Sequence, residues 1–171
     1  MPSTPWPAEC PSVSPSVAAG RPDPRPRPNT AAARIIINAP ASKIFDLLAN
    51  PAAHQSFDGS GTIQRSISGP ERLFLGAKFG MAMKIKVPYR IKNTVVAFEE
   101  SKKITWCHLM KWTWCYELEE LGDGKVQVTE SFDASNIPAF AKWWLKTTGA
   151  MAHNPKWMAK SLVALKAICE G

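Results

Sequence analysis

The residues from 111 to 120 alternate between two kinds of side chain, and this alternation constrains the fold more than any other feature of the chain. Trp112, Trp114, Tyr116 and Leu118 occupy every second position, and mostly polar residues lie between them. Successive side chains of a β-strand point to opposite faces of the sheet, so this run predicts a strand with one buried aromatic face.

The neighbouring runs predict further strands whose inner faces carry polar groups. Residues 104–108 place Ile104, Trp106 and His108 on one face, and residues 126–132 place Glu130 and Phe132 on one face. A histidine, a tyrosine and a glutamate among aromatic side chains are unusual in a solid core. This mixture is typical of the wall of a ligand cavity.

The order of the expected elements predicts an α+β fold with one curved antiparallel sheet around a long C-terminal helix. Two short helices are expected, over residues 40–50 and 51–57, and helical spacing returns after Pro138. Asn154 and Pro155 predict an N-cap and a first-turn proline for the last helix. The remaining runs predict strands at residues 33–38, 62–68, 76–87, 90–99, 103–109, 111–121 and 125–133. The inner face of residues 90–99 is ambiguous, because Val95, Val96 and Phe98 do not alternate cleanly.

The shared inner face also predicts how the central strands pair, since opposite residues of an antiparallel pair lie on the same face. A turn centred on Lys111 would place His108 opposite Trp114 and Trp106 opposite Tyr116. The same turn would place Cys107 opposite Cys115 on the outer face. A turn centred on Asp123 would place Tyr116 opposite Glu130 and Trp114 opposite Phe132.

The first 30 residues differ in composition from the rest of the chain. Nine of the fifteen prolines lie there, and the segment has almost no aliphatic pattern. Such a segment cannot bury a core, so we expect a disordered, Pro-rich tail over residues 1–30 and one folded domain over residues 31–171. A proline-binding partner is the alternative use of this tail.

The chain is basic, with a net charge of +7, and its charge and sequence signals bear on its partners and its location. Lys84, Lys86, Arg90 and Lys92 surround one expected turn, and this basic patch is interpreted either as a solvated sheet surface or as a contact to a membrane or nucleic acid. No nucleic-acid motif, secretory signal or membrane-spanning window occurs, so we expect a cytoplasmic protein without a nucleic-acid partner. The four cysteines show no CxxC spacing and the three histidines no metal-ligand spacing, so no metal is expected.

Five segments resemble a known family. Residues 41–51 followed by His54 and the loop at 58–61 look like the opening of the polyketide cyclase/dehydrase and lipid-transport family, in the START-like (SRPBCC) superfamily. Residues 87–90, 106–108, 114–118 and 128–133 look like its actinobacterial members. The resemblance covers nearly all of residues 33–171 and implies the helix-grip fold, in which about seven strands wrap the last helix and enclose a hydrophobic cavity. The family includes carriers, receptors and cyclases, so the resemblance does not decide the activity.

The cavity that this fold implies would bind a hydrophobic small molecule such as a lipid, polyketide or aromatic metabolite. Thioether and aromatic side chains suit an apolar ligand of loose specificity. The expected ligand-binding residues are Met81, Met83, Trp106, His108, Trp114, Tyr116, Glu130, Phe132, Trp144, Met151, Met158, Leu162 and Leu165. No cofactor is expected.

Two classes of function stay open at this point. In a carrier, His108 bonds to backbone or water and Glu130 anchors the long helix. In a cyclase or dehydratase, His108, Tyr116 and Glu130 are the candidate catalytic residues, with His108 as the base and Tyr116 polarising a carbonyl. The lack of a coherent base, orienter and oxyanion set favours the carrier. We expect a monomer or weak dimer, with transient membrane-surface contact as a further partner.

Overall fold

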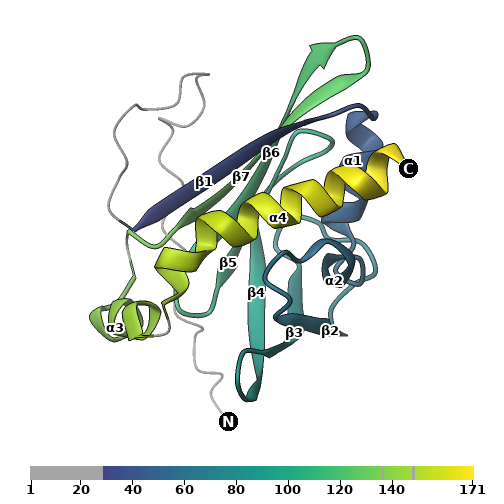
Figure 1. The fold of residues 1–171 in the computed structure, drawn as a ribbon. Helices are drawn as coiled ribbons and strands as arrows, with labels where there is room; N and C mark the ends of the chain where they lie inside the picture. Colours follow the sequence, from purple (N-terminus) through teal and green to yellow (C-terminus); the bar gives the residue numbers. More distant parts are fainter. Residues whose placement is uncertain (1–28, 136, 148) are drawn as a thin grey trace.

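The computed structural model describes residues 29–135, 137–147 and 149–171, and the expected tail over residues 1–30 lies almost entirely outside them. Seven antiparallel strands form one sheet in the order β1-β7-β6-β5-β4-β3-β2 (Figure 1). The strands are β1 (Thr30–Ile37), β2 (Ile63–Ser68), β3 (Lys78–Lys84), β4 (Pro88–Glu99), β5 (Lys103–His108), β6 (Thr113–Gly122) and β7 (Lys125–Asp133). The expected α+β helix-grip architecture is confirmed.

Four helices accompany the sheet: α1 (Ala41–Ala49), α2 (His54–Phe57), α3 (Ala139–Thr147) and α4 (Ala150–Glu170). Helix α4 runs diagonally across one face of the sheet (Figure 1) and packs along β1. The buried stripe of α4 includes Met158, Leu162, Leu165 and Cys169, spaced three or four residues apart as expected for one helical face. None of the described helices is long and apolar enough to cross a membrane.

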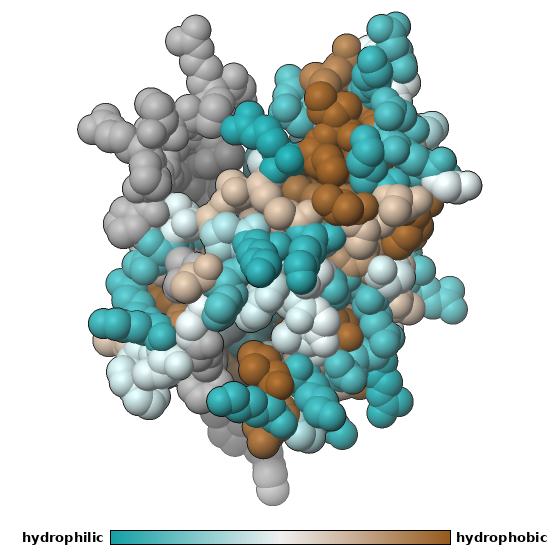
Figure 2. All heavy atoms as spheres, in the orientation of Figure 1, coloured by the Kyte–Doolittle hydropathy of each residue, from teal (hydrophilic) through white to brown (hydrophobic). Residues whose placement is uncertain are grey.

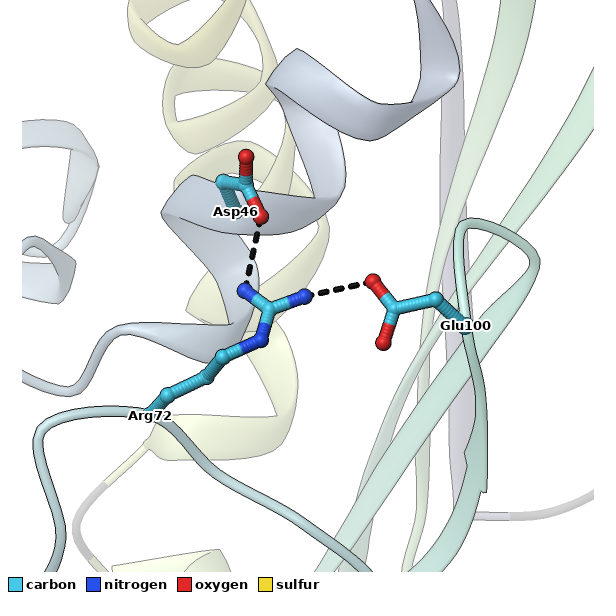
Figure 3. A network of polar contacts seen from close by, with 3 residues as sticks. All are labelled: Asp46, Arg72 and Glu100. Atoms are coloured by element: carbon cyan, nitrogen blue, oxygen red, sulfur yellow. Dashed lines mark hydrogen bonds and ion pairs between the residues drawn. The ribbon is translucent and has the colours of Figure 1, made fainter.

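An exposed ion-pair network fastens the loop between β2 and β3 to its neighbours. Arg72 donates to Asp46 of α1 and to Glu100 beside β4, as Figure 3 shows. The guanidinium also lies 5.9 Å from the centre of the Phe45 ring. In the same loop, the Leu73 amide donates to the Ala49 carbonyl at 2.7 Å and the Leu73 side chain is buried. The loop therefore connects α1 to the turn between β4 and β5.

The expected pairing of β5 with β6 is wrong by two residues. Trp106 lies opposite Trp114, and Tyr116 lies opposite Ile104. The turn is closed by hydrogen bonds from the His108 amide to the Trp112 carbonyl and from the Lys111 amide to the His108 carbonyl, and its last residue, Lys111, has a φ of 76°. In a three-residue hairpin loop, the left-handed residue is the last of the three and not the central one. The centre of this turn is therefore Met110 instead of Lys111, and a shift of the centre by one residue changes the pairing by two.

The two outer-face cysteines are consequently not cross-strand neighbours. Cys115 lies opposite Thr105, and Cys107 lies opposite Thr113. The prediction that they face one another is wrong for the same reason as the register.

The expected pairing of β6 with β7 is confirmed. Tyr116 lies opposite Glu130, and Trp114 lies opposite Phe132, whose rings are 4.8 Å apart. Two inward polar groups on adjacent strands are thereby brought face to face, and this pair forms part of the site described below.

A bulge in β4 and a left-handed glycine before α4 account for two differences from the sequence-based expectations. The β4–β5 register shifts between Val95 and Ala97, so a bulge in β4 breaks the alternation that residues 95–98 would otherwise show. Helix α4 begins after Gly149, which has a φ of 69°, and Pro155 lies inside the helix rather than in its first turn. The prediction of a helix start at Asn154 is therefore wrong, because a left-handed glycine separates α3 from α4 earlier in the chain.

Candidate functional site

A cavity of about 590 Å³ lies between the sheet and α4. Side chains of β3 to β7 form one wall, and α2 and α4 contribute the opposite side. Most of the lined surface is apolar, with aromatic rings and thioethers prominent, and polar side chains from several elements lie among them. This composition and volume match those of small-molecule pockets in general.

Most of the residues expected to bind a ligand line this cavity. They are Met81, Met83, Trp106, His108, Trp114, Tyr116, Glu130, Phe132 and Met158. Leu162 and Leu165 do not, because they are buried in the main core cluster under the later turns of α4. The side chains of Trp144 and Met151 lie outside what the structure describes.

Sequence reasoning missed several polar residues of the lining. His54, Asp58, Tyr89, Asn93, Asn154 and Ser161 all border the cavity. Helix α2 and the loop after it cover part of the cavity, and no periodic pattern in the sequence indicates where so short a segment packs. The resemblance did include His54 and the loop at 58–61, and that was the available signal.

His54 is held by one hydrogen bond and by stacking. Its Nε2 donates to the Leu48 carbonyl at 2.8 Å, and its ring stacks on Trp106 with centroids 5.2 Å apart. Burial lowers the pKa of the His54 imidazole below its usual value. The ring is therefore neutral near pH 7.

His108 has a fixed tautomer. The Met110 amide donates to Nδ1 at 3.0 Å, and Trp112 stacks on the ring at 4.1 Å. Burial lowers the pKa of His108 to about 4, so Nε2 carries the proton of a neutral ring near pH 7. Nε2 is buried and has no hydrogen-bond partner among the described residues. This ring can donate a hydrogen bond from Nε2, but neither nitrogen is free to accept a proton, so it does not suit a general base.

Tyr116 and Glu130 form a buried pair, and Glu130 is only 3 % exposed. The Tyr116 hydroxyl donates a hydrogen bond to the Glu130 carboxyl. Burial raises the pKa of Glu130 to about 8, against the opposite effect of that hydrogen bond, and burial also raises the pKa of Tyr116. The Oε2 atom of Glu130 has no partner among the described residues. The partner of Glu130 is Tyr116 on β6 and not a residue of α4. These contacts therefore do not support the expected role of Glu130 as an anchor for the last helix.

His108 and the Tyr116–Glu130 pair do not form one compact set. The His108 amide pairs with Trp112, whereas Glu130 lies opposite Tyr116, four residues further along the same segment. Four residues of a strand span roughly 13 Å. The three candidate catalytic residues therefore separate into two polar positions in one cavity.

The loop at 58–61 closes the cavity against α4. Asp58 accepts hydrogen bonds from the amides of Ser60 and Ile63 and from the Ser60 hydroxyl, at 3.0, 2.7 and 2.6 Å. The Gly59 amide donates to Ser161 Oγ of α4 at 2.9 Å. The negative charge of Asp58 adds to the burial that raises the Glu130 pKa.

No cluster of three or more metal-ligating side chains occurs within residues 29–135, 137–147 and 149–171. The polar groups of the cavity come from several elements.

No protein-family model matches the chain. The uncharacterized protein Rv0088 of Mycobacterium tuberculosis strain H37Rv is 36 % identical over 107 residues, which is 62 % of this chain and 48 % of that protein. The uncharacterized protein MT0096 of strain CDC 1551 is 35 % identical over the same length. The chain thus spans about half the length of the curated relatives that it matches.

Solved structures share the fold at low sequence identity. Protein Ms6760 of Mycobacterium smegmatis has a TM-score of 0.62 and 15 % identity, and the match covers 82 % of this chain and 90 % of that one. The Polyketide_cyc-like protein Cgl2372 of Corynebacterium glutamicum has a TM-score of 0.59 and 18 % identity, covering 85 % and 94 %. The Aha1 dimer of Colwellia psychrerythraea has a TM-score of 0.58 and 17 % identity, covering 82 % and 96 %. The chain shares the helix-grip fold of these solved structures, as the resemblance implied.

Proposed function

We propose that this protein binds and carries a hydrophobic small molecule in the cavity between the sheet and α4. The observation that carries the proposal is a cavity of about 590 Å³ whose wall is mainly apolar, with aromatic rings and thioethers prominent in it. A volume of this size accommodates a lipid chain, a polyketide or an aromatic metabolite. The fold shared with a Polyketide_cyc-like protein supports the same conclusion.

Met83→Trp is expected to weaken ligand binding at least about tenfold, because the larger ring occupies space that the ligand needs. A tenfold loss of affinity corresponds to about 1.4 kcal/mol of binding free energy. Met83 lines the cavity and is only partly buried, so the bulk can enter the cavity without displacing the core. The matched control is Val163→Trp, because Val163 is 60 % exposed on α4 and is not part of the lining. Native mass spectrometry of freshly purified protein measures the retained ligand in each variant. Equal retention by both variants, or no retained mass in the parent, would contradict the proposal.

Contact with a membrane surface is a second part of this proposal, and the β3–β4 hairpin favours it. Ile85 and Val87 are 50 % and 70 % exposed at the hairpin tip, and Ile85 also lines the cavity. Lys84 and Lys86 are exposed beside them. Figure 2 shows apolar side chains at this tip, at the bottom of the view, with hydrophilic ones next to them. Apolar residues flanked by lysines suit the interface of an anionic bilayer.

The double substitution Ile85→Ser with Val87→Ser should reduce co-sedimentation with vesicles that contain phosphatidylserine. Each removed side chain contributed about 1.5–3 kcal/mol of apolar transfer when buried in the bilayer. Both residues are exposed, so the melting temperature should stay nearly constant and serves as the control. Undiminished binding by the double variant would remove the hairpin from the proposal.

An enzymatic function is the alternative, and the Tyr116–Glu130 pair is the observation that favours it. A protonated carboxyl beside a phenol can polarise a carbonyl group of a polyketide-like substrate. The tautomer of His108 leaves this pair without a base from that residue, so the carrier is the function that the geometry supports better.

A further inference from the structure

One carboxyl oxygen of Glu130, Oε2, makes no hydrogen bond to any described residue of the chain. The Tyr116 hydroxyl bonds to the carboxyl, and Oε2 is buried without a partner. Buried polar atoms in folded proteins nearly always have a partner, from the protein, from water or from a ligand. Because Glu130 lines the cavity, the partner of Oε2 is expected to come from the cavity contents.

Burial and the negative charge of Asp58 favour the protonated form of the Glu130 carboxyl. The hydrogen bond from Tyr116 on β6 acts in the opposite direction and is outweighed by burial, and Ala33 of β1 lies opposite Glu130. His54 of α2 is neutral, and Asn154 and Ser161, the polar lining residues of α4, do not titrate. The carboxyl therefore presents an O–H donor near pH 7, since Tyr116 already donates to the other oxygen.

The described lining offers no buried cation to a ligand anion. Its only Lys and Arg residues are Arg90 and Lys92, which are exposed on β4 and alternate there with Tyr89, Ile91 and Asn93. A ligand carboxylate next to Glu130 would lose its hydration and would also face the negative charge of Asp58.

We infer that the cavity selects an uncharged apolar ligand with a carbonyl or other acceptor oxygen, which accepts a hydrogen bond from Glu130 Oε2, and that it discriminates against the corresponding carboxylate. This inference rests on the proposed function and names the class of ligand for that same cavity. A free fatty acid or an aromatic acid is therefore a poor ligand, and a ketone of similar shape is a good one.

Three probes of nearly equal shape separate these possibilities: 2-acetylnaphthalene, 2-ethylnaphthalene and 2-naphthoate. Equilibrium dialysis at about pH 6 and about pH 9.5 measures each affinity, with Glu130 protonated at the first pH and ionised at the second. For the parent at the lower pH, the acetyl probe should bind between about 5-fold and about 100-fold tighter than the ethyl probe, because it satisfies a buried donor. The naphthoate should bind more weakly than the acetyl probe. For the parent, the preference for the acetyl probe over the ethyl probe should disappear at about pH 9.5, because an ionised carboxylate has no proton to donate.

Two substitutions of Glu130 complete the test. Glu130→Gln should keep the preference at both pH values through its amide N–H, and Glu130→Leu should lose it at both. If the leucine variant does not fold, the comparison of the parent with Glu130→Gln still decides the question.

The failures of the inference and of the proposed function are distinguishable. Equal affinities for the acetyl and ethyl probes would overturn the inference and assign the partner of Oε2 to water, while leaving apolar binding intact. Tightest binding of the naphthoate would also overturn it. Absence of binding by all three probes would overturn the proposed function, and the inference with it.

Discussion

Gly59→Ala is expected to lower the free energy of unfolding by about 2–4 kcal/mol and to weaken retention of any ligand. A Cβ atom at this position would lie 2.3 Å from the Trp157 carbonyl oxygen and 2.4 Å from the Ser161 amide nitrogen. Both atoms belong to the backbone of α4, so neither can move aside without shifting the helix. Overpacking of this kind costs about 1–3 kcal/mol, and the hydrogen bond from Gly59 to Ser161 contributes about 1 kcal/mol more.

Two controls separate the steric effect from the other effects of a substitution at this site. Ser161→Ala removes the hydrogen bond to Gly59 without adding an atom, and should cost about 1 kcal/mol. Gly61→Ala lies in the same loop with open space around the new Cβ and a φ of 65°, so it tests backbone strain alone at about 1–2 kcal/mol. Urea denaturation measures all three variants. A Gly59→Ala protein as stable as the parent would show that the loop does not dock on α4 as described.

The order and type of the elements could be predicted because they depend on local periodicity. The alternation of residues 111–120 indicated β6 and its buried face, and the pairing of Tyr116 with Glu130 followed from that face. The β5–β6 register could not be obtained in the same way. It depends on the left-handed conformation of Lys111, and nothing in the side-chain pattern shows which loop residue adopts it.

The cavity wall was predictable on the sheet and less so under the helices. Strand alternation assigns inner and outer faces directly, so the sheet residues were placed correctly. Along α4 the apolar stripe is continuous, but the cavity borders only its earlier part, where Met158 lies, and the core takes Leu162 and Leu165. Hydrophobic periodicity shows that a residue is buried without showing whether protein or cavity lies beside it.

The second large effect concerns Glu130→Gln, which is expected to stabilise the protein at alkaline pH relative to the parent. Burial is the main cause that raises the pKa of Glu130 from 4.5 to about 8 in the folded state. Below about pH 4.5 the carboxyl is protonated in both the folded and the unfolded chain, so the substitution changes little there. Between about pH 4.5 and about pH 8 the unfolded chain releases the proton and the folded chain keeps it, so the parent loses stability as the pH rises.

The expected gain of the glutamine variant over the parent is on the order of 3–5 kcal/mol above pH 8, since one pKa unit corresponds to about 1.36 kcal/mol. His54 and His108 also affect the pH profile, because their lowered pKa values reduce stability as the pH falls below about 6.5. That effect is common to parent and variant, so the difference between their urea denaturation curves at each pH isolates Glu130.

The matched control is Glu117→Gln on β6, where the same chemical change should lower the free energy of unfolding instead of raising it. The Glu117 carboxylate pairs with Lys103 at 2.9 Å and is partly exposed, so losing its charge should cost up to about 1 kcal/mol at neutral pH. A glutamine at position 130 that destabilised the protein at every pH would show instead that Glu130 is ionised when folded and has a partner that compensates its charge. In that case Oε2 would not be a donor, and the cavity would bind a ligand through an anionic carboxylate rather than a neutral acid.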